Sequence, residues 1–113
     1  MIDHVRPAQL SDWFAQALAE GQPLVLDVRE PWELQTSSVR TDGFELMAIP
    51  MGELPHRLAE LDPSRPLACL CHHGARSLRV AAFLAQQGFG TVANITGGID
   101  AWSREHDPSV PRY

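Results

Sequence analysis

The sequence has 113 residues, of which 44% are hydrophobic and 20% charged, and its formal net charge is −5 at pH 7. These values are typical of one folded domain and exclude a disordered or fibrous chain. The acidic balance, with charges of both signs interspersed, gives no basic patch, so we expect neither nucleic acid nor membrane lipid as a partner.

The first residues, MIDHVRPAQLSDWF, lack the basic and apolar regions of a secretory signal peptide. No apolar run approaches the roughly 18 residues that a membrane span requires. We therefore expect a cytoplasmic protein. Its two cysteines, Cys69 and Cys71, are one residue apart and would remain free thiols in a reducing compartment.

The first third of the chain predicts a strand, a helix and a second strand. The strand covers residues 2–5, and the helix has Ser11 as its N-cap and ends at Gly21. The apolar run PLVLDVRE, residues 23–30, has no helical period and predicts a buried strand. The residues that would share the apolar face of the helix are Leu10, Trp13, Phe14, Ala17 and Leu18.

The middle of the chain continues this alternation. The segment PWEL predicts one helical turn with Pro31 at its first position. The polar stretch 35–44 contains an Asp-Gly turn signal and predicts a surface loop. A strand ending at Pro50 and an amphipathic helix over residues 52–61 follow.

The last third predicts a strand over residues 67–71, a helix over 76–87 with Gly88 as its C-cap, and a strand over 91–95. A helix after the Gly97-Gly98 pair completes the regular structure. Because strands and helices alternate throughout, the sequence predicts an α/β fold with a mostly parallel sheet and helices on both faces.

Cys71 stands where a predicted strand ends and the next helix begins. Open α/β sheets bind ligands beyond the carboxyl ends of their strands. Backbone N–H groups in the loop over residues 71–77, together with the partial positive charge of the helix, would form a cradle for an anion. Such a cradle favours the thiolate, so we predict that Cys71 is a nucleophile rather than a small buried hydrophobic residue.

The residues that follow Cys71 have a geometric or an electrostatic interpretation. Gly74 would allow a backbone conformation that a Cβ opposes, and Ala75 would keep the rim of the loop open. Arg76 could direct its donors at an oxyanion, the alternative being a solvated residue in the first helical turn. Ser77 is either a hydroxyl of the helix N-terminus or a donor to the thiolate.

His72 and His73 suggest two further possibilities. With Cys69 and Cys71 they supply four potential metal ligands, but a segment of five residues is too short to surround a tetrahedral ion, so we expect no metal and no cofactor. One histidine could instead act as the base for Cys71. The alternative is that both imidazoles are exposed and change only the local potential at acidic pH.

With these residues in place, the chain resembles the rhodanese family, and specifically its single-domain sulfurtransferases, over about residues 5–102. Four stretches support the resemblance: residues 27–33 (DVREPWE), Ile49-Pro50, residues 71–77 and residues 97–102 (GGIDAW). It implies one rhodanese-like domain over residues 1–113, with a core over about 5–105 and an irregular tail over 107–113. The implied fold has three layers around a central parallel sheet of five strands.

The resemblance also implies a function. Cys71 would carry sulfane sulfur as a persulfide within the loop formed by residues 72–77, taking it from thiosulfate or a persulfide and passing it to cyanide or a thiol, including a protein thiol. Asp27 and Arg29 would be a structural pair near the loop. Cys69 is outside the family motif and would be a core thiol or a resolving partner.

Two other functions compete with sulfur transfer. Phosphatases and arsenate reductases also place a cysteine in an anion cradle, but relatives with this fold use a longer loop than the four residues between Cys71 and Arg76. A non-catalytic binding module is the second alternative, although such modules usually lack the cysteine. The segment from Arg40 to Phe44 departs from the family pattern, so the resemblance does not determine the rim of the pocket there. Both a monomer and a weak dimer are compatible with the sequence.

Overall fold

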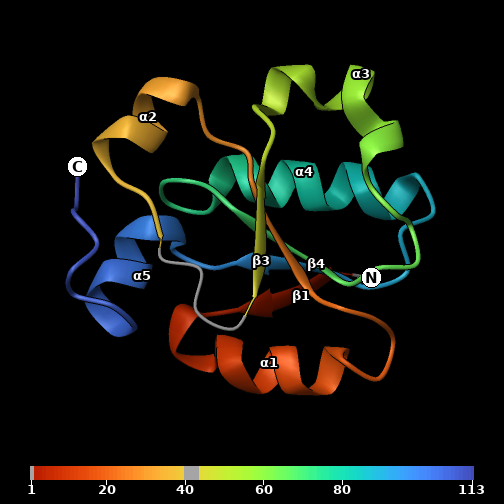
Figure 1. Ribbon diagram of the computed structural model, residues 1–113, viewed down its shortest axis with the longest axis horizontal. Helices are drawn as coiled ribbons and strands as arrows, with labels where there is room; N and C mark the ends of the chain where they lie inside the picture. The colour runs from red at the N-terminus through yellow and green to blue at the C-terminus, as the bar shows by residue number, and fades with distance from the viewer. Residues whose placement is uncertain (1, 40–43) are drawn as a thin grey trace.

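The computed structural model describes residues 2–39 and 44–113. These residues form a single five-stranded sheet in the order β1-β5-β4-β2-β3, in which every pair of neighbouring strands is parallel (Figure 1). The α/β fold predicted from the sequence is confirmed, and the sheet is parallel throughout these residues. The strands are β1 (Ile2–Val5), β2 (Leu24–Asp27), β3 (Glu45–Ala48), β4 (Leu67–Leu70) and β5 (Val92–Ile95).

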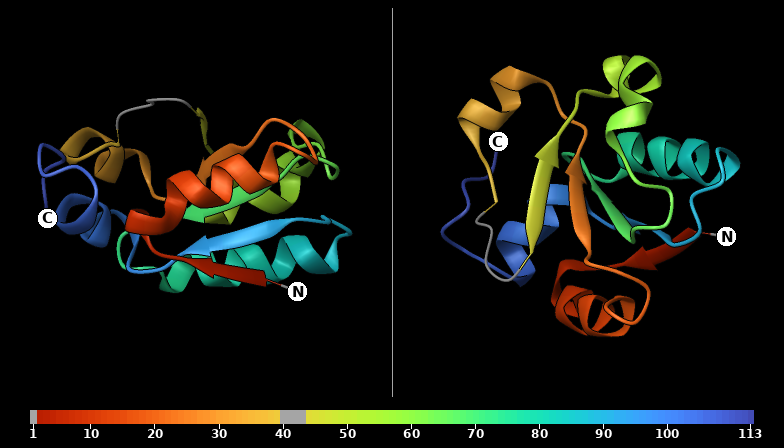
Figure 2. Two further views of the ribbon diagram at one scale, coloured as in Figure 1. Left: turned by 90° about the horizontal axis from the view of Figure 1, so that it is seen from below. Right: turned by 45° about the vertical axis from the view of Figure 1, so that its right-hand side comes forward.

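Helices cover both faces of the sheet (Figures 1 and 2). Alternate residues of the three central strands point to opposite faces, so Leu26 and Cys69 belong to one apolar cluster and Val25 and Ala68 to the other. The first cluster packs against α3 and α4, and the second against α1 and α5. The helices are α1 (Leu10–Ala17), α2 (Pro31–Thr36), α3 (Leu54–Arg57), α4 (Ala75–Gln86) and α5 (Gly98–Glu105).

Two details of the first helix differ from the prediction. Ser11 lies inside α1 rather than at its N-cap, because a 3-10 turn over Pro7–Gln9 leads directly into the helix and moves its start to Leu10. Leu18 is 55% exposed. It follows the last helical residue, where the apolar face no longer meets the sheet, so its inclusion in that face was wrong.

The predicted helix over residues 52–61 is broken into three short pieces. A 3-10 turn (Met51–Glu53) precedes α3, and a second one (Leu58–Glu60) follows it. Pro55 lies in the first turn of α3; its missing N–H group and its ring, which opposes a helical carbonyl four residues earlier, account for the break between Met51–Glu53 and α3.

The predicted surface loop over residues 35–44 is shorter and less exposed than expected. α2 extends to Thr36, while Ser37 and Val39 are buried. The Ser37 hydroxyl donates a hydrogen bond to the carbonyl oxygen of Pro111, 2.5 Å away. Residues 40–43 lie outside the described part of the chain, and with them most of the predicted pocket rim.

Residues 107–113 contain no helix or strand, but they are packed onto the domain. Val110 is buried in the cluster beneath α5, and the chain end lies beside α2 (Figure 1). This path brings Tyr113 to the carboxyl end of the sheet, next to the loop that follows β4. None of the helices in residues 2–39 and 44–113 is long and apolar enough to cross a membrane.

Candidate active site

Cys71 is the first residue after β4 and is 1% exposed. The backbone N–H of Gly74 donates a hydrogen bond to its sulfur, with an N–Sγ distance of 3.0 Å. α4 begins one residue later, at Ala75, so the sulfur lies at the N-terminus of a helix of 12 residues. An N–H donor and the positive end of a helix both stabilise negative charge on this sulfur.

Gly74 provides the conformation that this contact requires. Its φ of 103° lies in the left-handed region, as expected from its place in the loop, and it forms the N-cap of α4. A Cβ at this position would also stand 3.1 Å from the backbone nitrogen of Gly97. A side chain here would therefore shift the loop and turn its N–H away from Cys71.

The first residues of α5 are hydrogen-bonded to the backbone of the loop after β4. The N–H groups of Ile99 and Asp100 donate to the carbonyl oxygens of Cys71 and His72, at 2.8 and 3.2 Å. A Cβ on Gly98 would lie 2.4 Å from both of these oxygens, so only glycine allows the approach. Because α5 binds both carbonyls, they do not oppose an anion at the sulfur.

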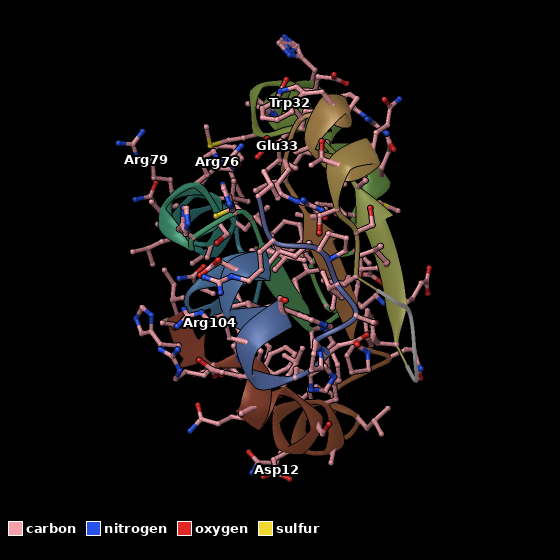
Figure 3. All side chains as sticks on the ribbon, turned by 90° about the vertical axis from the view of Figure 1, so that its left-hand side faces the viewer. Asp12, Trp32, Glu33, Arg76, Arg79 and Arg104 are labelled. Carbon is pink, nitrogen blue, oxygen red and sulfur yellow. The ribbon has the colours of Figure 1, made fainter. Side chains whose placement is uncertain are left out.

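Arg76 forms an ion pair with a carboxylate of the protein, which the sequence did not predict. Its two terminal nitrogens donate to the two carboxylate oxygens of Glu33 on α2, each at 2.7 Å. Figure 3 shows Glu33 and Arg76 side by side, with Arg79 farther out on the surface of α4. A carboxylate that is only 3% exposed requires a cation, and Arg76 is the one that meets it.

Glu33 has all its acceptor positions filled. Besides Arg76, it accepts hydrogen bonds from the N–H of Glu30, at 2.9 Å, and from the hydroxyl of Tyr113, at 2.8 Å. The hydrogen bonds from Arg76 lower the pKa of Glu33 to about 2, against the opposing effect of burial. In turn, Glu33 raises the pKa of Arg76. The pair is therefore ionised and carries no net charge.

Asp27 and Arg29 form a second buried pair at the end of β2. Nε and Nη2 of Arg29 donate to the Asp27 carboxylate, the shortest distance being 2.8 Å, and both side chains are at most 1% exposed. The Arg29 Nη1 donates to the Tyr113 hydroxyl at 3.0 Å. Tyr113 thus joins this pair to Glu33, since the same hydroxyl donates to that carboxylate.

The two histidines lie on the outer side of the loop. The ring of His72 stacks between those of His73 and Tyr113, with centroid distances of 3.9 and 3.8 Å. His72 Nε2 is 2.6 Å from the main-chain oxygen of Tyr113. Within residues 2–39 and 44–113, neither imidazole is hydrogen-bonded to Cys71, and no cluster of three or more His, Cys, Asp or Glu side chains could hold a metal ion.

Ser77 and Cys69 are directed into the interior. The Ser77 hydroxyl lies 2.5 Å from Asn94 Oδ1 and 3.2 Å from the carbonyl oxygen of Gly74, which supports the interpretation as a hydroxyl of the helix N-terminus. Cys69 is fully buried in the same cluster as Cys71. Burial raises the pKa of its thiol to about 12, with a smaller contribution from Cys71, so Cys69 stays protonated.

Sequence reasoning missed three residues around the loop: Glu33, Asn94 and Tyr113. Glu33 had a local signal, because it lies three residues after Glu30 in a capping box at the start of α2. Tyr113 had none, since it lies in an irregular tail 37 positions after Arg76. Its contacts follow from the path of the tail.

In this protein a buried cysteine directly follows the central strand of a parallel sheet. Its sulfur accepts an N–H hydrogen bond at the N-terminus of a helix. These features define a class of α/β proteins with a cysteine in an anion-binding loop. The family model of the rhodanese-like domain matches residues 10–105, and the chain belongs to the rhodanese family. Its single-domain relatives include a sulfurtransferase from Allochromatium vinosum, 36% identical over 101 residues that cover 88% of this chain and 91% of the relative.

Two further similarities extend this finding. The rhodanese-like/PpiC domain-containing protein 12 of Arabidopsis thaliana is 41% identical over 79% of this chain, but the match spans only 30% of that longer relative. The crystal structure of a rhodanese-related protein from Thermoplasma volcanium superimposes with a TM-score of 0.76 at 32% identity, covering 98% of this chain and 99% of the other. The fold is therefore that of the rhodanese family over nearly the whole chain.

Proposed function

We propose that this protein is a sulfurtransferase in which Cys71 carries the transferred sulfur as a persulfide. The observation that carries the proposal is the 3.0 Å hydrogen bond from Gly74 to the Cys71 sulfur at the N-terminus of α4. This arrangement favours the thiolate as the attacking group and stabilises negative charge on the outer sulfur of a persulfide. The relative from Allochromatium vinosum, which bears the name sulfurtransferase, supports the same reaction class.

The reaction has two displacements. The Cys71 thiolate attacks the outer sulfur of thiosulfate or of an organic persulfide, and the S–S bond of the donor breaks. Sulfite or a thiolate leaves with the electron pair of that bond. In the second half, cyanide or an acceptor thiolate attacks the outer sulfur of the Cys71 persulfide and releases the Cys71 thiolate. The protein contributes position and charge stabilisation to both steps.

The burial of Cys71 favours donors with a terminal sulfur atom. Because the residue is only 1% exposed, a bulky reacting centre could not reach the thiolate without moving the loop. A sulfane sulfur at the end of an S–S bond is a single atom and needs little room. Only four residues separate Cys71 and Arg76, and we expect a ring this short to fit one sulfur atom better than a tetrahedral phosphoryl group.

Intact-protein mass spectrometry tests the proposal. The parent protein should gain one sulfur atom after incubation with thiosulfate or a persulfide and lose it on addition of cyanide, whereas Cys71→Ser should gain none. Cys69→Ala is the matched control and should load normally; alanine is chosen because a serine hydroxyl would be buried without a partner. Sulfur uptake by Cys71→Ser at the parent rate, or hydrolysis of aryl phosphate by a parent that takes up no sulfur, would contradict the proposal.

A further inference from the structure

The charges around Cys71 are balanced within the described residues. Arg29 is paired with Asp27, and Arg76 is paired with Glu33 through two hydrogen bonds of 2.7 Å. Arg76 is the second residue of α4, directly after the loop that holds the Cys71 sulfur, so it is a cation at the edge of the site. Its positive charge is already compensated by a carboxylate before any donor arrives.

Arg76 cannot readily leave Glu33 for a substrate. The carboxylate is fixed by the Glu30 N–H and by the Tyr113 hydroxyl, so it cannot follow the arginine if the guanidinium turns away. Burial raises the pKa of Tyr113, so its hydroxyl keeps the proton that it donates to Glu33. Separation would leave a carboxylate that is 3% exposed without its cation, which is strongly unfavourable.

We propose that Glu33 is a specificity-determining residue: by neutralising Arg76 it disfavours dianionic thiosulfate relative to an organic persulfide. This proposal rests on the proposed function. Thiosulfate brings two negative charges toward a thiolate, and the groups that stabilise it there are the N–H of Gly74, the start of α4 and an arginine whose charge Glu33 already balances. An organic persulfide brings at most one charge, and its leaving group is a single thiolate, so it depends far less on a free arginine.

Tyr113 acts with Glu33 as a positioning residue. Its hydroxyl accepts from Arg29 and donates to Glu33, while its ring stacks on His72 with an interplanar angle of 7°. The tail thereby locks the carboxylate in the geometry that binds both terminal nitrogens of Arg76. Loss of the hydroxyl alone should loosen Glu33 and release part of the positive charge of Arg76.

The test measures sulfur loading of Cys71 with two donors, thiosulfate and the persulfide of 2-mercaptoethanol generated in situ. Quenched reactions followed by intact mass give a second-order rate constant for each. Glu33→Gln should raise the constant for thiosulfate roughly tenfold and change that for the persulfide by less than about twofold. The matched control is Glu60→Gln, which removes an exposed carboxylate on another element and should alter neither constant by more than about twofold.

Salt dependence separates charge from structural loosening. In Glu33→Gln the gain with thiosulfate should decline between about 0.02 and 0.3 M salt, because an uncompensated arginine attracts the dianion through a screened field. The parent should show a weaker dependence. Equal factors of change for the two donors, or a gain that salt does not reduce, would overturn the proposal.

A second variant decides the question if Glu33→Gln fails to fold. Tyr113→Phe keeps the aromatic ring and should raise the thiosulfate constant relative to the persulfide constant by about two- to threefold, since only part of the carboxylate's support is lost. An unchanged ratio would refute the role of the Glu33 network. If the parent is loaded by neither donor, the proposed function itself is wrong; if it is loaded by both and the ratio never moves, only the assignment of Glu33 is wrong.

Discussion

Replacement of Glu33 by glutamine should lower the free energy of unfolding by an amount that depends on pH. The pKa of this carboxyl falls from its ordinary value of 4.5 to about 2 in the folded protein, chiefly because of its hydrogen bonds to Arg76. At about 1.4 kcal/mol for each pKa unit, this difference corresponds to a preference of about 3 kcal/mol for the charged over the neutral side chain. Glutamine approximates the neutral form in shape.

The sign of the effect follows from the direction of the change in pKa. A pKa that is lower in the folded state means that the unfolded state binds the proton more tightly, so the stabilisation is complete above about pH 5 and is lost as the pH falls through about 2. The cost of Glu33→Gln should therefore decline from about 3 kcal/mol at pH 7 to about 1.4 kcal/mol at pH 3.

Urea unfolding followed by circular dichroism at pH 7, 5, 4 and 3 measures this cost, because urea is uncharged and leaves the ion pair unscreened. Glu60→Gln serves as the control and should show a small effect at every pH, since its carboxylate is exposed. A cost for Glu33→Gln that stays constant from pH 7 to pH 3 would refute the reasoning. It would mean that the loss came from packing around α2 rather than from the charge.

Two further substitutions test the frame around Cys71. Gly98→Ala would place a Cβ 2.4 Å from the carbonyl oxygen of Cys71 and should slow sulfur loading by about a hundredfold. The control Gly90→Ala, whose Cβ would meet nothing within 4 Å, should load normally. Equal loading rates for the two variants would show that the contact at Gly98 does not position the loop. Asp27→Ala should cost about 3–5 kcal/mol in urea unfolding because it leaves Arg29 buried without its carboxylate. Adding Arg29→Met should recover part of that loss, and a double variant no more stable than the single one would argue against a charge effect.

The sequence by itself determined the order of the elements and the place of Cys71. Leucine-rich and β-branched runs without helical period marked the central strands, and the turn after the fourth strand placed Cys71 at the carboxyl edge of the sheet. Gly74 was predictable because a loop that turns N–H groups inward requires a backbone angle that glycine adopts freely. These features depend on residues close together in the chain, so they can be predicted from local sequence patterns.

Only the tertiary structure decided what the charged side chains do. Arg76 sits in the first turn of α4, where its sequence position favours an anion-binding group over a solvated residue. Its partner Glu33 comes from α2, and the residue that fixes this partner, Tyr113, comes from the irregular tail. Periodicity tells which side of an element is buried, but not which distant element will cover it. The net charge beside Cys71 is therefore set by long-range packing, because a buried carboxylate such as Glu33 is stable only when the fold brings a cation to it.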